Sequence, residues 1–216
     1  MSRERWATFD CYGTLIDWNG GIRGELARVF GEERADAELA RYHELEPTLQ
    51  AGGGRSYREV MTVAMAALGA PSGEEGGLAA ALPDWGPFPE VRASLEETRS
   101  RGWRLALLSN TDRDLIDSSM VSIGIAFKLI VVAGEIGSYK PAPKHWEVFR
   151  EKSHADPARH VHVAQSLFHD IEPAAAIGLP TIWINRLGEP DDPRPTRTLT
   201  GVADLADALD SLVPPE

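Results

Sequence analysis

The chain has 216 residues, enough to bury a core, and its 43% hydrophobic and 25% charged residues are typical of an ordered globular protein. The formal net charge of −11 argues against nucleic-acid binding, which normally requires a basic face, and against binding to an anionic membrane surface. It does not exclude a small anionic substrate, because a nearby Arg or Lys can dominate the potential inside a pocket.

The residues also predict the compartment. Cys11 is the single cysteine, so an internal disulfide is excluded and a reducing cytoplasm is expected. The N-terminal stretch MSRERWATFD has no apolar block of the secretory type, and no segment approaches the ~20 apolar residues needed to span a bilayer. We therefore expect a cytoplasmic protein with no membrane partner.

Short aliphatic and aromatic runs predict buried strands, and helical patterns separate the later ones. In chain order the expected strands are Arg5–Phe9, Trp103–Ser109, Phe127–Ala133, His160–Gln165 and Thr181–Asn185. Gly102 and Gly124 end two of the intervening helical segments, as expected of helix termini. This alternation predicts an α/β fold, a Rossmann-like parallel sheet with helices on both faces.

The segment after the first strand has a different pattern. Residues 36–50 and 57–68 are amphipathic with helical spacing, a Gly-rich turn separates them, and no convincing strand occurs before the Pro-rich stretch 83–89. We therefore expect a discontinuous core domain, residues 1–16 and 88–216, interrupted by a helical cap domain at residues 17–87.

Polar side chains follow four of the expected strands. Asp10 comes directly after the first, Ser109 and Asn110 end the second, Lys140 lies shortly after the third, and Asp170 follows the fourth. Ligands of open parallel sheets bind beyond the carboxyl ends of the strands. The sequence therefore predicts one site at this edge of the sheet.

Four stretches that carry these residues resemble a known family. DCYGTL, LLSNTD, SYKPAP and HDIEPAAAIGLPTIWINR are similar to the four ordered motifs of the haloacid dehalogenase superfamily. The first resembles the Asp-x-Tyr-Gly-Thr-Leu motif of the type II 2-haloacid dehalogenases, and the insert matches the helical cap of that branch in position and size. The resemblance covers the whole core and implies a hydrolase.

Tyr12 decides between the chemistries of the superfamily. Its phosphatases carry an Asp two residues after the nucleophile, which protonates the leaving alcohol, whereas a halide leaves as a stable anion and needs no proton. Tyr12 would instead shape a small apolar pocket. We therefore expect Asp10 to attack the halogen-bearing carbon of a small 2-halocarboxylate and form an ester, as in (S)-2-haloacid dehalogenases. Lys140 and Asp170 would then position the hydrolytic water, without metal or other cofactor.

The substrate carboxylate and the halide each need partners. Backbone N–H groups after Asp10, including that of Cys11, could form an anion cradle with Ser109 and Asn110, although the Cys11 side chain itself is expected to be packed. Thr14 either donates a hydrogen bond to Asp10 or caps the next turn.

The helical insert is expected to supply the rest of the pocket. Arg41 resembles the family arginine that receives the halide, but an Arg on an amphipathic helix also commonly pairs with a nearby Glu, here Glu38 or Glu44. Trp18 and Tyr57 could wall the pocket or belong to the core.

The fourth motif departs from the family pattern. It reads AQSLFHD where type II dehalogenases resemble SSNxWD, so Gln165, Leu167 and His169 replace a Ser, an Asn and a Trp, while Asp170 is retained. Gln165 or His169 could substitute for the lost Asn, the second step could be slow, or the substrate could differ. Ser166 with His169 and Asp170 is not expected to form a triad, because residues so close in sequence rarely reach triad geometry.

Two other functions stay open at this point. One is a Mg²⁺-dependent phosphatase of a small phosphorylated metabolite, with Asp10 and Asp170 as oxygen ligands. The other is a catalytically weak ligand-binding or interaction protein on the same scaffold. His160 and His162 share a strand face, but two ligands without a third are a weak metal site. Relatives in this branch are often homodimers, so a homodimer is a further expectation.

Overall fold

The computed structural model describes residues 4–215, so that residues 1–3 and 216 of the expected core lie outside the described part. One six-stranded sheet runs through the core in the order β3-β2-β1-β4-β5-β6, with every pair of neighbours parallel. The strands are β1 (Arg5–Phe9), β2 (Trp103–Ser109), β3 (Leu129–Val132), β4 (His160–Ala164), β5 (Thr181–Ile184) and β6 (Arg197–Leu199). The predicted α/β fold is confirmed.

The centre of the sheet lies at β1, all of whose residues are buried. Phe9 at its end is paired with Leu107 of β2 and with Val163 of β4, so the three strands end nearly level. The residue after Phe9 is Asp10. A buried apolar strand therefore delivers this carboxylate to the middle of the sheet edge, as the strand-end rule predicts.

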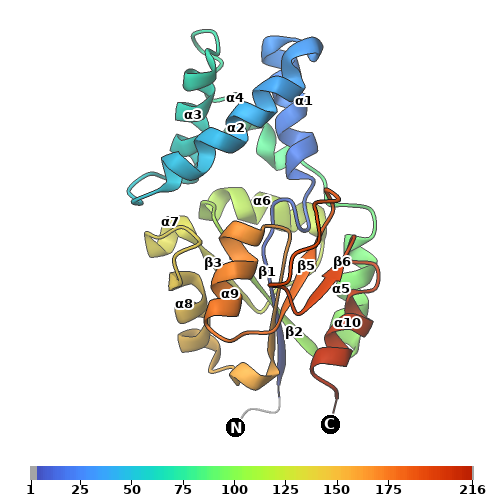
Figure 1. Ribbon diagram of the computed structural model, residues 1–216. Helices are drawn as coiled ribbons and strands as arrows, with labels where there is room; N and C mark the ends of the chain where they lie inside the picture. The colour runs from blue at the N-terminus through green and yellow to red at the C-terminus, as the bar shows by residue number, and fades with distance from the viewer. Residues whose placement is uncertain (1–3, 216) are drawn as a thin grey trace.

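Helices cover both faces of the sheet (Figure 1). On one face, α5 (Val91–Ser100), α6 (Arg113–Ile123) and α10 (Leu205–Leu212) share a core cluster with Ala7 and Phe9. On the other face, α8 (Lys144–Ser153) and α9 (Glu172–Ala176) pack in a cluster with Trp6. The alternation of Trp6 and Ala7 between the two clusters is the period-two pattern of a strand buried on both sides.

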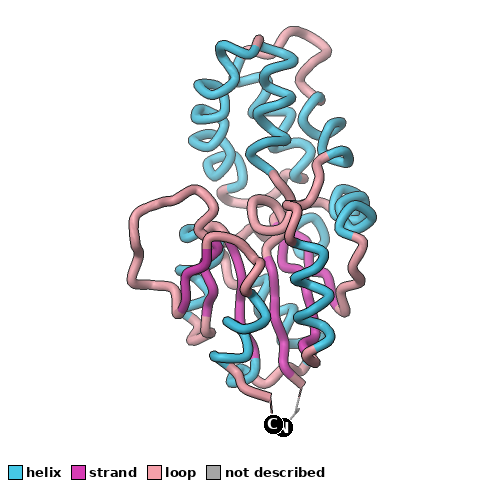
Figure 2. The backbone as a smooth tube through the Cα atoms, turned by 90° about the vertical axis from the view of Figure 1, so that its right-hand side faces the viewer, coloured by secondary structure: helices cyan, strands magenta, loops and turns pink. Residues whose placement is uncertain are grey.

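Between Asp17 and Trp85 the chain forms helices joined by loops, with no strand. These are α1 (Trp18–Phe30), the short helix η1 (Glu32–Arg34), α2 (Ala35–Gln50), α3 (Tyr57–Leu68), α4 (Gly77–Ala81) and η2 (Leu82–Asp84). Figures 1 and 2 show them stacked beyond the carboxyl ends of the strands, above α6 and α7 (Ala133–Ile136) in the view of Figure 1. They form a roof over the edge at which Asp10 lies.

The two connections to this helical part run side by side. The backbone N–H of Asp17 donates to Gly86 O at 3.0 Å, and that of Phe88 donates to Leu15 O at 3.0 Å. Asp17 also caps α1, since its side chain accepts from Gly20 N, and Ser56 forms a capping box with Glu59 at the start of α3. Among the described residues no helix is both long and apolar enough to cross a membrane.

Candidate active site

A cavity of about 220 Å³ lies between the sheet edge and the helical roof. The sheet side contributes Asp10, Tyr12, Asn110, Lys140, Gln165, His169 and Asp170. The roof contributes Trp18, Asn19, His43, Glu46, Gln50 and Tyr57. The structure thus brings polar residues after β1, β2, β3 and β4 to one cavity, as the sequence predicts.

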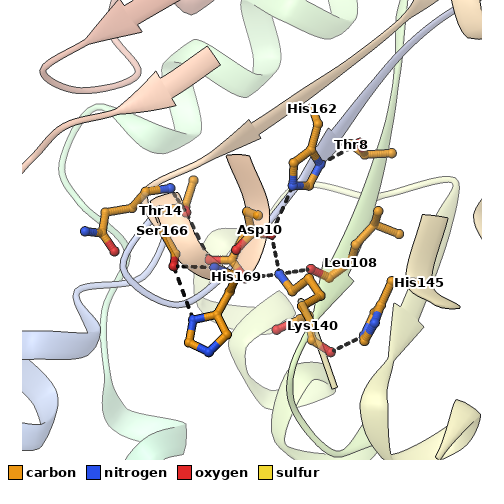
Figure 3. A network of polar contacts seen from close by, with 12 residues as sticks. Thr8, Asp10, Thr14, Leu108, Lys140, His145, His162, Ser166 and His169 are labelled. Carbon is orange, nitrogen blue, oxygen red and sulfur yellow. Dashed lines mark hydrogen bonds and ion pairs between the residues drawn. The ribbon is translucent and has the colours of Figure 1, made fainter. Parts of the chain in front are cut away.

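Lys140 joins the carboxylates of Asp10 and Asp170. Figure 3 labels Lys140 with two of its partners, Asp10 and Leu108. Its Nζ donates to Asp10 Oδ1 at 2.8 Å, to Asp170 Oδ1 at 2.6 Å and to the carbonyl oxygen of Leu108 at 2.8 Å. The side chain is 1% exposed, so water cannot replace any of these partners. An ammonium has three N–H donors, and all three are used.

The pKa values of Lys140, Asp10 and Asp170 depend on one another's charges. Burial acts against the charged form of Lys140, but the carboxylates of Asp10 and Asp170 outweigh it and raise the lysine pKa. Burial alone would also raise the pKa of Asp170, yet Lys140 and His162 hold it well below its ordinary value. For Asp10, burial and the charge of Asp170 raise the pKa against the opposing effects of Lys140 and Thr14. Asp10 is therefore the more basic carboxylate of the two, and the better suited to act as a nucleophile.

The turn after β1 orients Asp10. The N–H groups of Leu15 and Ile16 both donate to Cys11 O, at 2.8 and 3.0 Å, and Gly13 adopts a φ of +87°, which a residue with a Cβ rarely does. Thr14 Oγ1 donates to Asp10 Oδ2 at 3.0 Å and accepts from the N–H of Gln165 at 3.0 Å. Of the two roles expected for Thr14, the structure shows the hydrogen bond to Asp10.

A chain of hydrogen bonds between buried side chains holds Asp170 in place. His162 Nε2 lies 3.0 Å from Asp170 Oδ1, and Thr8 Oγ1 lies 2.9 Å from His162 Nδ1 and 2.7 Å from His160 Nε2. With each imidazole protonated on Nε2, every contact has one donor and one acceptor. Burial lowers the pKa of His160 to about 3, which keeps that ring neutral. The shared strand face of the two histidines was predicted, but their role as supports of Asp170 was missed.

Asn110 fixes the loop that carries Lys140. Its side-chain oxygen accepts from the Lys140 N–H at 2.7 Å, and its Nδ2 donates to Lys140 O at 3.0 Å and to Gln50 Oε1 at 3.1 Å. Ser109 and Cys11 are fully buried and do not line the cavity. The Ser109 side chain faces into the fold, and only the next residue faces the cavity. An anion cradle that includes Ser109 stays a prediction.

Aromatic side chains form the apolar part of the wall. Tyr12 and Tyr57 stack with ring centroids 6.4 Å apart, and Trp18 Nε1 donates to the Tyr57 hydroxyl at 3.0 Å. The Tyr12 hydroxyl is bonded to Ser119 Oγ at 3.0 Å, and burial raises its pKa above the ordinary value. Tyr12 therefore keeps its proton at neutral pH and is a weak acid, with its hydroxyl bonded to Ser119.

Arg41 lies away from the cavity. Its side chain is half exposed and pairs with Glu38 Oε2 at 2.7 Å, one helical turn earlier on α2. Arg41 is not among the residues that line the cavity, and its guanidinium pairs with Glu38, the alternative partner that the sequence suggests. A contact between Arg41 and the halide stays a prediction. The face of α2 that points inward carries Tyr42, Glu46 and Gln50 at a spacing of four residues.

Glu46 is the functional candidate that sequence reasoning missed. The residue is 7% exposed, lines the cavity and shares no ion pair in the described part of the chain. Burial raises its pKa to about 7, and the negative charge of Asp10 adds to the effect. Its spacing from Tyr42 and Gln50 on an amphipathic helix is the signal that could have identified it.

The altered fourth motif forms a short π-helix, Leu167–Ile171. Gln165 and His169 line the cavity, whereas Leu167 packs beside the cluster of Ala164, Ile171 and Trp183. Ser166 Oγ accepts from the His169 N–H at 3.0 Å and lies 3.2 Å from His169 Nδ1, while Asp170 faces Lys140. No Ser-His-Asp triad forms among these residues.

Comparison with known proteins shows what the chain is similar to. Residues 5–178 match the sequence-family model of the haloacid dehalogenase-like hydrolases. The chain is 29% identical over 200 residues to an (S)-2-haloacid dehalogenase of Pseudomonas sp. (strain YL), covering 87% of this chain and 85% of that protein. It is 32% identical over 124 residues to a phosphoserine phosphatase of Thermus thermophilus, covering 56% of this chain and only 49% of the phosphatase.

Among solved structures, one of L-2-haloacid dehalogenase from Xanthobacter autotrophicus superposes with a TM-score of 0.83 at 16% identity, covering 95% of this chain and 98% of that one. At this identity the superposition establishes the shared fold. The family match covers most of the chain, and the protein therefore belongs to the haloacid dehalogenase-like hydrolases.

Proposed function

We propose that the protein hydrolyses the carbon–halogen bond of a small 2-halocarboxylate, in the manner of the (S)-2-haloacid dehalogenases that it resembles. The observation that carries this proposal is Tyr12. Its hydroxyl is bonded to Ser119, and its raised pKa makes it a much weaker acid than the carboxyl that the superfamily's phosphatases carry two residues after the nucleophile. A halide is a leaving group that needs no proton.

The first step is displacement at carbon. A carboxylate oxygen of Asp10 forms a bond to the carbon that bears the halogen, while the carbon–halogen bond breaks and both its electrons leave with the halide. The product is an ester of Asp10. Thr14 and Lys140 each bond one Asp10 oxygen, so they hold the carboxylate plane in one orientation.

The second step is hydrolysis of that ester. Water attacks the Asp10 carboxyl carbon, and negative charge develops on a carboxyl oxygen, where the Lys140 ammonium stabilises it. Asp170 holds Lys140 in place and, with its lowered pKa, is a poor base. His169 lines the same cavity, and because burial lowers its pKa the ring is neutral and has a nitrogen free to accept the proton of the water. Collapse breaks the bond between the Asp10 carboxyl carbon and the substrate oxygen, and that oxygen takes the proton held by His169 and leaves as the hydroxyl of the 2-hydroxy acid. The remaining water proton is lost to solvent as the Asp10 carboxylate is restored.

We extend the proposal to the organisation of the chain. Residues 17–87 act as a cap domain that closes the site, and residues 1–16 and 88–216 form the core that carries the reacting groups. The paired connections at Asp17–Gly86 and Leu15–Phe88 are where the cap would move. A cytoplasmic location and a homodimer stay predictions.

A Mg²⁺-dependent phosphatase is the second candidate, and the similarity to a phosphoserine phosphatase favours it. Asp10 and Asp170 would hold the ion, since Mg²⁺ commonly uses one or two carboxylates, and the ion would neutralise charge on a phosphate. Against it, Lys140 already bonds Oδ1 of both carboxylates, and Tyr12 is a weak acid for protonating a leaving alcohol.

Halide release separates these candidates. With a panel of chlorinated and brominated 2-halo acids, we expect turnover that EDTA leaves unchanged, and no Mg²⁺-stimulated hydrolysis of p-nitrophenyl phosphate. The reason is that Lys140 supplies the positive charge at Asp10. Strict metal dependence with phosphate release would establish the phosphatase instead. Absence of both activities, with no ester on Asp10, would favour a catalytically weak binding protein.

A further inference from the structure

A second cavity lies on the face of the sheet that α8 and α9 cover. Its volume is about 220 Å³, and it shares no lining residue with the active-site cavity. Its walls are mainly apolar and include the side chains of Phe149, Ala155, Pro157 and Leu179. We call it the α8 pocket, because α8 forms much of its wall. Its size and its walls suit a small molecule built on one aromatic ring.

A buried histidine, His160, gives this pocket a hydrogen-bonding group. The residue is 4% exposed, and its ring packs against Phe149 with centroids 4.7 Å apart. Its Nε2 lies 2.7 Å from Thr8 Oγ1, whereas its Nδ1 has no hydrogen-bond partner among the described residues. The Nδ1 atom is not sealed inside the core, since the described buried polar atoms without a partner do not include it. A ligand in the α8 pocket can therefore reach Nδ1.

The active site determines which kind of partner His160 Nδ1 can take. Asp170 is held as a carboxylate, so the proton between it and His162 Nε2 belongs to the imidazole. With His162 protonated on Nε2 alone, its Nδ1 accepts the Thr8 hydroxyl proton at 2.9 Å. The Thr8 oxygen then accepts from Nε2–H of His160, whose pKa burial lowers to about 3. His160 Nδ1 therefore carries a lone pair, and its ligand must be a donor.

The α8 pocket also has a cation that is free to bind an anion. Arg150 is exposed, lines the pocket and has no carboxylate partner in the described part of the chain. Glu147, which also lines the pocket, lies 3.7 Å from Lys144. A guanidinium binds a carboxylate through two parallel N–H···O hydrogen bonds. The pocket thus offers an apolar wall, a buried acceptor and a free cation.

We propose that the α8 pocket is a second ligand site, which binds a small hydroxyaryl carboxylate. The aromatic ring lies between the apolar walls, the hydroxyl donates to His160 Nδ1, and the carboxylate pairs with Arg150. A few well-placed polar groups in an apolar cavity are the usual means by which a protein orients a small ligand. The site does not depend on the proposed carbon–halogen chemistry, and its test needs no turnover.

Calorimetry at neutral pH with three ligands of similar shape tests the site. They are 4-hydroxyphenylacetate, 4-fluorophenylacetate, which lacks the donor, and 4-hydroxyphenylacetamide, which lacks the charge. We expect 4-hydroxyphenylacetate to bind the wild type with a Kd below about 1 mM. It should bind about two- to tenfold more tightly than the fluoro compound, as one hydrogen bond dictates. Its advantage over the amide should be about two- to fivefold, the scale of one exposed ion pair.

Two variants separate the two contacts. In Arg150→Gln, the acid should lose its advantage over the amide and keep its advantage over the fluoro compound. In His160→Phe, which keeps a ring against Phe149 but has no acceptor, the opposite result is expected. Lys152→Gln is the matched control, because it removes the same charge from an exposed position of α8 that does not line the pocket. It should bind all three ligands as the wild type does.

Absence of binding to the wild type would overturn the inference. So would preferences for the hydroxyl and for the carboxylate that stay unchanged in Arg150→Gln and His160→Phe, because the ligand would then occupy another place, including the active site. If His160→Phe does not fold, the ¹⁵N resonance of His160 Nδ1 in the wild type reads the same contact. It should shift with 4-hydroxyphenylacetate and not with 4-fluorophenylacetate, and equal shifts would contradict the assignment.

Discussion

Replacing Asp10 by Asn is expected to lower kcat for halide release by at least about 10⁴-fold, the scale on which removal of a covalent nucleophile acts. The amide matches the carboxylate in shape, and its oxygen can still accept from Lys140, which bonds Asp10 Oδ1 at 2.8 Å in the native protein. What it lacks is the negative charge and the basicity needed to attack carbon. Halide release and intact-protein mass after incubation with substrate measure the two consequences.

Asp17→Asn is the matched control for this variant. Asp17 lies on the same connection, is exposed, and accepts a hydrogen bond from Gly20 N as the cap of α1. Asn caps helices as well as Asp does, so its turnover should stay within about twofold of the wild type. Retention of even a few per cent of activity in Asp10→Asn, with a covalent adduct still formed on the protein, would show that another residue is the nucleophile.

Replacing Lys140 by Met should have the largest effect on stability. The change leaves the carboxylates of Asp10 and Asp170, both buried, without the ammonium that bonds them at 2.8 and 2.6 Å. Loss of one partner from a buried ion pair typically costs about 3–5 kcal/mol in the free energy of unfolding. Urea denaturation at pH 8 measures this loss, and halide release should fall below detection in the same preparation.

The pH dependence of that loss has a definite sign. Without Lys140, we expect the pKa values of both carboxylates to rise, because burial and mutual repulsion are then opposed only by Thr14 at Asp10 and by His162 at Asp170. The folded variant then binds more protons than the unfolded chain, and its stability falls as pH rises. The deficit relative to the wild type should therefore be larger at pH 8 than at pH 5.

Lys144→Met tests whether this deficit is specific to the buried lysine. Lys144 is half exposed and lies 3.7 Å from Glu147, so its removal should change the free energy of unfolding by less than about 0.5 kcal/mol. An equal loss in Lys144→Met and Lys140→Met, or a larger deficit for the latter at pH 5, would contradict the shared ammonium.

The sheet and most of the site were predictable because they depend on short-range signals. Buried apolar runs identify the five strands that the sequence predicts, and the carboxyl ends of parallel strands must meet at one edge. The shared edge brings Asp10, Lys140 and Asp170 together, whichever way their side chains point. β6 was missed because Arg197 and Thr198 are exposed and the strand is only three residues long, which gives no apolar run to detect.

The direction in which a side chain points was not predictable from the sequence. Arg41 was chosen by resemblance, whereas the helical spacing of Tyr42, Glu46 and Gln50 identifies the inward face of α2 only once the helix is known to lie over the site. Ser109 and Asn110 are adjacent, and a difference of one position moves a side chain from the cavity wall into the fold. Such directions depend on tertiary packing, which no local pattern in the chain contains.

A single turnover in H₂¹⁸O tests the central claim most directly. Because water attacks the Asp10 carboxyl carbon of the ester, the product hydroxyl oxygen comes from Asp10 and the ¹⁸O stays in the protein. With enzyme in excess over a 2-halocarboxylate, we therefore expect unlabelled 2-hydroxy acid and ¹⁸O in the peptide that contains Asp10. Label in the product, with none in that peptide, would show that water attacks the substrate carbon itself and would contradict the account.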